Sequence, residues 1–148
     1  MNKHLNRLII ILSIGIIFCV HAQSDLSNSN NGYGQIYIFR STGMQGSPWK
    51  FKILLETNVI CKLGNKKYSF HEIKAGVHLF SAKFYGKKET LGSKPLLIDV
   101  KAGGTYYIKL VIEEIVSIIS KSELNCVQIT EKESDLLFNS LKEEDKCY

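Results

Sequence analysis

Two histidines on either side of a short turn are the first residues whose spacing could support chemistry. His71 and His78 flank residues 74–76, Lys-Ala-Gly. If the Lys and Ala of this segment form a two-residue hairpin loop, the imidazoles lie opposite each other, at a distance that suits two ligands of one metal ion. A three-residue loop shifts the register and places them on opposite faces. Since no third ligand is obvious and Glu72 would face away, we interpret both as ordinary strand histidines and expect no metal and no cofactor.

Three cysteines follow the N-terminal segment, which is an odd number for a chain with disulfides. Cys126 and Cys147 both lie in the C-terminal region, and we predict a disulfide between them that pins the tail to the last strand. Cys61 alternates with Val59 and Leu63 and is interpreted as a small buried core residue. The histidines and amides are not arranged as in a known cysteine nucleophile, so we expect no cysteine enzyme.

Carboxylates give no sign of acid–base catalysis. Glu56, Glu72, Glu89 and Asp99 are scattered, and no motif pairs them as glycoside hydrolysis requires. The sequence also has no Gly-x-Ser-x-Gly elbow, P-loop or dinucleotide fingerprint. We therefore expect a protein that is not an enzyme.

Exposed aromatic side chains are the better candidates for binding. Trp49 and Tyr107 could offer stacking faces to a sugar or peptide, although such rings more often belong to the core of a β-sandwich. The loops at 41–48 and 86–94 would flank such a surface. Arg40 completes the predicted binding residues. It is the one arginine after the N-terminal segment, which argues against a nucleic-acid partner read by bidentate arginines.

Charge is distributed unevenly along the chain. Residues 50–109 contain 12 lysines and 4 acidic residues, whereas residues 110–148 contain 4 lysines and 9 acidic residues. A basic body could attract an anionic partner such as an acidic glycan. The alternative is that lysines decorate exposed strands and discourage edge-to-edge pairing.

The N-terminal segment has the three parts of a secretory signal peptide. Lys3 and Arg7 precede an uncharged run of 13 residues at 8–20, and a cleavage site follows at Ala22. The apolar run is shorter than the roughly 20 residues that a membrane-spanning helix needs. We therefore predict an exported protein, periplasmic or extracellular, that meets the membrane only through its signal peptide.

A lipid anchor is the less favoured alternative. Cys19 could carry a lipid, but Phe18 places a bulky side chain where a small one is wanted. Cleavage after residue 22 leaves 126 residues with a net charge of +3, which suits one domain. We expect a flexible leader at 23–34, a β-domain at 35–130, and a helix with an acidic tail at 131–148.

Short β-rich runs separated by turn signals fill the predicted domain. Alternating apolar and polar residues, rich in aromatic and β-branched types, predict strands. Residues 131–144 are good helix formers with Leu137 and Leu141 four apart. We predict an all-β fold, an antiparallel β-sandwich of seven to eight strands, Ig-like or transthyretin-like, with a short C-terminal helix. The predicted strands are 35–40, 49–56, 59–63, 68–73, 77–85, 96–100 and 105–112, with one or two more in 115–130.

Two junctions repeat one pattern, in which glycine precedes a strand. "KAGVHLF" covers residues 74–80, and "KAGGTYYIKLVI" covers residues 101–112. Because glycine adopts positive φ at little cost, we expect both to be tight turns that begin a strand.

Three short motifs follow one another along the chain. They are a Tyr-x-x-Arg strand at 37–40, Ala-Gly at 75–76 before His78, and Ala-Gly at 102–103 before Tyr-Tyr at 106–107. In this order and spacing they resemble a family of small bacterial envelope domains of unknown function. The resemblance covers roughly residues 34–113 and implies a secreted or lipid-anchored β-sandwich without known catalysis.

The chain departs from the family pattern in two places. Asn58 stands where the family turn often has Asp-Gly, and the C-terminal tail does not align with it. Our first hypothesis is an exported, non-enzymatic interaction or structural module whose partner is a protein or an anionic glycan, with the oligomeric state left open. The alternative is a small-molecule or carbohydrate-binding module that uses Trp49 and Tyr107. A metal hydrolase built on His71 and His78 is the third hypothesis.

Overall fold

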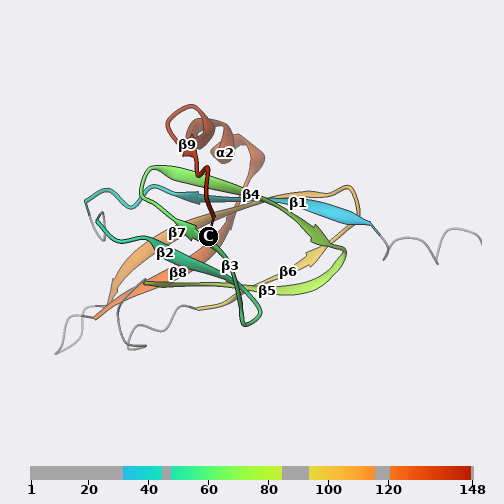
Figure 1. Cartoon of the computed structure of the whole chain (residues 1–148), viewed down its shortest axis with the longest axis horizontal. Helices are drawn as coiled ribbons and strands as arrows, with labels where there is room; N and C mark the ends of the chain where they lie inside the picture. Colours follow the sequence, from blue (N-terminus) through green and yellow to red (C-terminus); the bar gives the residue numbers. More distant parts are fainter. Residues whose placement is uncertain (1–31, 45–47, 85–93, 116–120, 148) are drawn as a thin grey trace, which may run out of the picture.

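The computed structural model describes residues 32–44, 48–84, 94–115 and 121–147 (Figure 1). The predicted signal peptide at 1–22, most of the predicted leader and the predicted strand residues 116–120 lie outside these ranges. Within them, no helix has the length and apolar character needed to cross a membrane.

The described chain is built almost entirely of strands, which confirms the all-β prediction. Its single described helix is short, and it follows the last long strand. The elements are β1 (Tyr33–Arg40), β2 (Phe51–Leu55), β3 (Asn58–Leu63), β4 (Lys67–Lys74), β5 (Gly76–Phe84), β6 (Leu96–Val100), β7 (Thr105–Ile115), β8 (Lys121–Ile129), α2 (Glu131–Phe138) and β9 (Lys142–Glu143).

The strands form two sheets with different connectivity. The five-stranded sheet has the order β8-β7-β1-β4-β9, and the four-stranded sheet has the order β3-β2-β5-β6. Most neighbours are antiparallel, but β1 pairs with β7, and β4 with β9, in parallel. The prediction of a purely antiparallel fold is therefore wrong. Parallel neighbours need a long crossover, and between β1 and β7 the chain makes it by building the whole four-stranded sheet.

One hydrophobic core joins the two sheets. On β1, Ile36 and Ile38 point into it, and on β2, Phe51 and Ile53 do the same; all four side chains are fully buried. The alternation of side chains along each strand places these residues on one face and leaves their neighbours on the other. In Figure 1, α2 lies on one side of β1 and β4, and β3 and β5 lie on the other side.

The junction at residues 74–76 is a crossing between sheets. β4 belongs to the five-stranded sheet and β5 to the four-stranded sheet, so the chain changes layer at Ala75. The Ala75 N–H donates to the carbonyl of Gly32 at 2.8 Å, and Gly76 has φ of 145°, a conformation that favours glycine. The hairpin that would have placed His71 opposite His78 is therefore not formed.

The second glycine junction behaves as predicted. Gly103 has φ of 74° and leads from β6 into β7, a backbone conformation that favours glycine. Its N–H donates to the carbonyl of Tyr33 at 2.9 Å, and the N–H of Gln35 donates to the carbonyl of Gly104 at 2.8 Å. These bonds attach the turn to the start of β1, the strand that pairs with β7.

Helix α2 begins at the predicted residue but ends earlier. Thr130 and Glu133 form a capping box, in which the Thr130 side chain accepts from the Glu133 N–H and the Glu133 carboxylate accepts from the Thr130 N–H. The predicted helix over 131–144 is too long: α2 stops at Phe138, and Lys142 and Glu143 form β9 against β4. Leu141, which the sequence placed on the helix, is buried just before β9.

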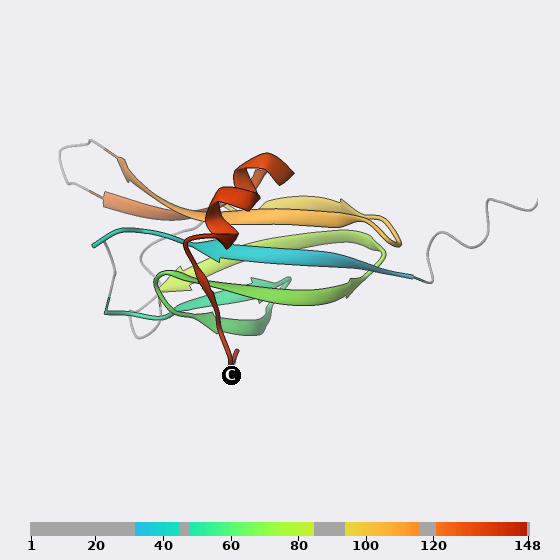
Figure 2. The same cartoon turned by 90° about the horizontal axis from the view of Figure 1, so that it is seen from above.

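The helix covers an aromatic cluster on the outer face of the five-stranded sheet. The Phe138 ring meets the rings of Phe39, Tyr68 and Tyr37 edge-on, with centroid distances of 4.9, 5.1 and 5.2 Å. Edge-to-face contacts at such distances are favourable beyond the area they bury. Figure 2 shows α2 lying across this sheet.

We expect Phe138→Ala to lower the free energy of unfolding by about 2–3 kcal/mol, because it removes the ring that closes the aromatic cluster. Chemical denaturation followed by circular dichroism measures this change. Leu136→Ala is the matched control: Leu136 is 71% exposed on the same helix, and its loss should change stability by no more than about 0.5 kcal/mol. Equal effects of the two substitutions would contradict the packing role of Phe138.

Candidate functional site

Three lysines stand side by side on the outer face of the four-stranded sheet. Lys52 of β2 is directly opposite Lys62 of β3 on one side and Lys83 of β5 on the other. Each of the three follows a residue whose side chain is fully buried in the core, so the lysine side chains project from the opposite face. We call these three residues the lysine row.

The lysine row places three positive charges on directly opposed residues of neighbouring strands. Side chains directly opposite on neighbouring strands have Cβ atoms about 4.5–5.5 Å apart, and like charges in this arrangement are destabilising. Each of the three lysines also takes part in an interaction within the protein. An anion with several negative groups could contact all three at once.

An exposed aromatic residue and a further lysine directly precede β2 in the chain. Trp49, which is 53% exposed, precedes β2 by two residues and lies at the same end of this strand as Lys52. Lys50 lies between them in the chain and forms an ion pair with Glu144 at 3.5 Å. The structure thus leaves the predicted binding residue Trp49 accessible near the start of β2.

Farther along the same face, the surface is apolar. Leu79 of β5 is opposite Leu97 of β6, and Leu97 is 64% exposed. Ser81 separates Leu79 from Lys83 along β5. The outer face of the four-stranded sheet therefore has a basic end and an apolar end.

Tyr107 is held within the aromatic cluster. Its ring stacks on Tyr37 at a centroid distance of 5.8 Å and meets Phe138 edge-on at 6.4 Å. Burial, and then the charge of Glu131, raise the pKa of its phenol. A partly open hollow of about 360 Å³ lies beside it, lined by Thr105, Tyr106, Tyr107, Gln128, Ile129 and Glu131.

Arg40 is inside the protein, which corrects its prediction as a surface binding residue. Its side chain is fully buried, and its Nη1 donates to the carbonyls of Trp49 at 2.6 Å and Leu63 at 2.8 Å. The guanidinium carbon lies 3.4 Å from the centroid of the Phe51 ring. Burial lowers the pKa of Arg40 to about 10, so the group stays charged at neutral pH. It fastens the ends of β1, β2 and β3 together.

The predicted disulfide has the wrong partner. Cys147 is bonded to Cys61, and Cys126 is a buried thiol. Cys126 lies opposite Leu110 within the five-stranded sheet and faces the core. The tail instead passes from β9 to the edge strand of the other sheet, where the Lys62 N–H donates to the Cys147 carbonyl at 2.9 Å. The interpretation of Cys61 as a buried residue is confirmed, but its role in the disulfide was missed.

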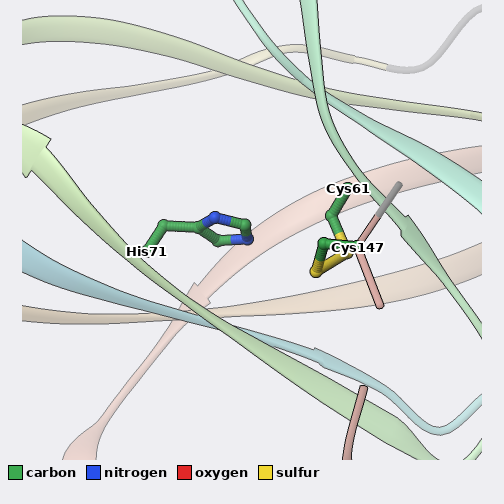
Figure 3. A group of neighbouring side chains, drawn as sticks. All are labelled: Cys61, His71 and Cys147. Carbon is green, nitrogen blue, oxygen red and sulfur yellow. A yellow bond between two sulfur atoms is a disulfide. The ribbon is translucent and has the colours of Figure 1, made fainter. Parts of the chain in front are cut away.

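His71 lies beside this disulfide, and His78 lies elsewhere. Figure 3 shows the His71 ring directed toward Cys61 and Cys147, and the donor atoms of these three residues lie within 4.8 Å of one another. Burial lowers the pKa of His71, and its Nε2 is 3.0 Å from the Ser69 hydroxyl. The His78 Nδ1 is 3.1 Å from the Glu56 carboxylate. The two histidines therefore do not form the metal pair considered from the sequence.

Sequence reasoning missed both groups of residues because each depends on pairing across the fold. Alternation in β2 shows that Lys52 faces away from Phe51 and Ile53, but the row appears only when β3 and β5 are aligned beside it. The approach of His71 to Cys61 depends on a contact between β4 of one sheet and β3 of the other. The excess of lysines in residues 50–109 was the one available signal for the basic face.

Comparison with known proteins found no matching family model, curated protein or solved structure. The resemblance to the family of envelope domains stays a prediction that rests on its short motifs.

We expect loss of the disulfide to lower the free energy of unfolding by about 4–5 kcal/mol, because it links residues 86 apart and restricts the unfolded chain. The measurement is denaturant unfolding of Cys61→Ala/Cys147→Ala under non-reducing conditions. A phosphine reductant should destabilise the unmodified protein by a similar amount and leave the double variant unchanged. A reductant effect of equal size on both proteins would contradict this role.

Cys126 should resist alkylation in the folded protein. Burial raises the pKa of its thiol to about 12, and the thiolate is the reactive form. At pH 8, iodoacetamide should modify Cys126 only after denaturant is added, as measured by peptide mass spectrometry. Rapid modification of the folded protein at this position would show that the thiol is accessible and ionised.

Proposed function

We propose that this protein is an exported, non-enzymatic β-sandwich that binds an acidic polysaccharide on the outer face of its four-stranded sheet. The lysine row is the single observation that carries the proposal. Export is inferred from the predicted signal peptide. The sandwich assignment is supported by the single core that residues of both sheets share.

The spacing of the lysine row suits a polymer with repeated negative groups. Neighbouring strands are about 4.7–4.9 Å apart, so the three lysine stems leave the sheet along a line that crosses β3, β2 and β5. Lysine ammonium groups act as point charges without the fixed geometry of a guanidinium. They can therefore follow carboxylates along a flexible glycan.

Trp49 supports a glycan over other polyanions. An indole face can stack on the apolar face of a sugar ring while lysines contact its carboxylates. A nucleic acid is less favoured, because bidentate readout of bases uses arginine and Arg40 is buried. This end of β2 thus offers charge and one exposed ring.

The contacts of several acidic side chains are consistent with a non-enzymatic role. Glu133 caps α2, Glu56 accepts from the Leu79 N–H, and Glu144 accepts from the Gly64 N–H. Each of these carboxylates holds backbone in place. This supports the proposal that the protein acts by recognition.

A second candidate function is binding of a neutral sugar in the hollow beside Tyr107. The hollow of about 360 Å³ favours it. The Tyr107 ring itself is engaged with Tyr37 and Phe138, so a ligand there would meet the phenol edge and the side chains of Gln128 and Glu131. Such binding would depend little on salt, whereas binding at the lysine row would depend on it strongly.

The test is titration of the protein with polygalacturonic acid, with dextran as the neutral polymer. We expect Lys52→Gln/Lys83→Gln to weaken binding by about tenfold or more at low salt, because two of three neighbouring charges are lost. Raising the ionic strength should weaken binding of the unmodified protein in the same direction. Quenching or a shift of Trp49 fluorescence would report contact at this end of the sheet.

Lys74→Gln is the matched control, since Lys74 is an exposed lysine on β4 of the other sheet. It should bind the polymer as the unmodified protein does. Affinity that is independent of salt, or equal losses in the control and the double variant, would overturn the proposal. Equal binding of dextran would favour the hollow beside Tyr107.

A further inference from the structure

Three metal-binding side chains from separate segments meet at one edge of the molecule. Cys61 is on β3, His71 is on β4, and Cys147 is in the tail that follows β9. Their donor atoms all lie within 4.8 Å of one another (Figure 3). Because β3 and β4 belong to different sheets, the cluster spans the boundary between the two layers.

The tail reaches this position through contacts that do not depend on the disulfide. We call residues 142–147 the C-terminal strap. Lys142 pairs with Lys67 on β4, the Glu144 carboxylate accepts from the Gly64 N–H at 2.9 Å, and the Cys147 carbonyl accepts from the Lys62 N–H at 2.9 Å. The backbone of Cys147 is thus hydrogen-bonded to the residue next to Cys61. Reduction would therefore leave the two sulfur atoms close together.

We propose that Cys61, Cys147 and His71 form a binding site for a thiophilic d¹⁰ metal ion, Zn(II) or Cu(I), when the disulfide is reduced. Two thiolates and one imidazole are a donor set that both ions accept. A disulfide alone needs no imidazole beside it. The position of His71 is the observation that distinguishes this cluster from a purely covalent link.

The geometry requires only small movements. Zinc–sulfur bonds are about 2.3 Å and zinc–nitrogen bonds about 2.0–2.1 Å, so tetrahedral ligand atoms are separated by roughly 3.3–3.8 Å. After the sulfur–sulfur bond is broken, the two thiolates move apart toward this separation, and His71 closes on them from within 4.8 Å. Binding through His71 Nε2 would replace the 3.0 Å contact of this nitrogen with the Ser69 hydroxyl.

Partial exposure of two of the three residues gives a metal ion access to the cluster. Cys61 is fully buried, whereas His71 and Cys147 are half-buried. A reductant and then an ion can therefore approach from the strap side. Three protein ligands leave a fourth position for water on Zn(II), and they complete the shell of a three-coordinate Cu(I).

The chemistry balances with a dithiol as reductant. The dithiol supplies two electrons and two protons, breaks the Cys61–Cys147 bond to give two thiols, and becomes a disulfide itself. Binding of the ion then releases the two thiol protons to solvent. The ion replaces the disulfide as the link between β3 and the C-terminal strap, so the strap stays closed in both states.

The test uses the full chain, reduced with a phosphine and kept without oxygen, and titrated with Zn(II). Co(II) serves as the spectroscopic substitute, because thiolate-to-cobalt charge transfer reports sulfur ligands directly. We expect one ion per chain. His71→Ala should weaken binding by about tenfold or more, since it removes one of three ligands.

His78→Ala is the matched control, because His78 is a strand histidine bound to Glu56 on the other sheet. It should bind the ion as the unmodified protein does, and so should Cys19→Ser/Cys126→Ser. Circular dichroism of the oxidised proteins, and of the reduced proteins before the ion is added, shows whether each is folded under the conditions of the test.

Three results would overturn the proposal. The first is reduced protein that binds no stoichiometric ion. The second is equal affinity in the His71→Ala and His78→Ala variants. The third is a cobalt spectrum that disappears when Cys126 is replaced, because it would assign the sulfur ligand to the wrong thiol.

Discussion

The structure depends on the burial of β1 on both of its faces. Ile36 and Ile38 point toward the four-stranded sheet, while Tyr37 and Phe39 point to the opposite side. A central strand that is apolar on both faces needs a cover on each. The four-stranded sheet covers one face, and α2 covers the other through Phe138. The position of the C-terminal helix is thus a consequence of the composition of the first strand.

A second constraint acts at the edge where the two sheets must be held together. There Arg40 donates to the carbonyls of Trp49 and Leu63, and the C-terminal strap joins β4 to β3 before the disulfide to Cys61. The lysine row and Trp49 stand at this same end of β2 and β3. The proposed binding surface is therefore built on the part of the fold where hydrogen bonds, a buried charge and a covalent link converge.

The bounds of the strands were predicted well where apolar and polar residues alternate clearly along the chain. The strand at 96–100 has its predicted bounds, and those at 59–63 and 68–73 are extended by only one or two residues. The start of α2 was also correct, because helix propensity begins directly after a capping residue. The end was wrong: α2 stops at Phe138, and residues 142–143 pair with β4 in the five-stranded sheet.

By itself, the sequence determined that the protein is rich in strands, where most of them lie, and which side chains alternate between faces, because these properties depend on residues close together in the chain. It could not determine that Cys147 meets Cys61, that His71 joins them, or that three lysines align across β3, β2 and β5. Those outcomes depend on strand register and on which sheet each strand enters. A shift of one residue in the strand register, or a crossing between sheets in place of a hairpin, changes which side chains meet. Only the tertiary structure decides the register and the sheet that each strand enters.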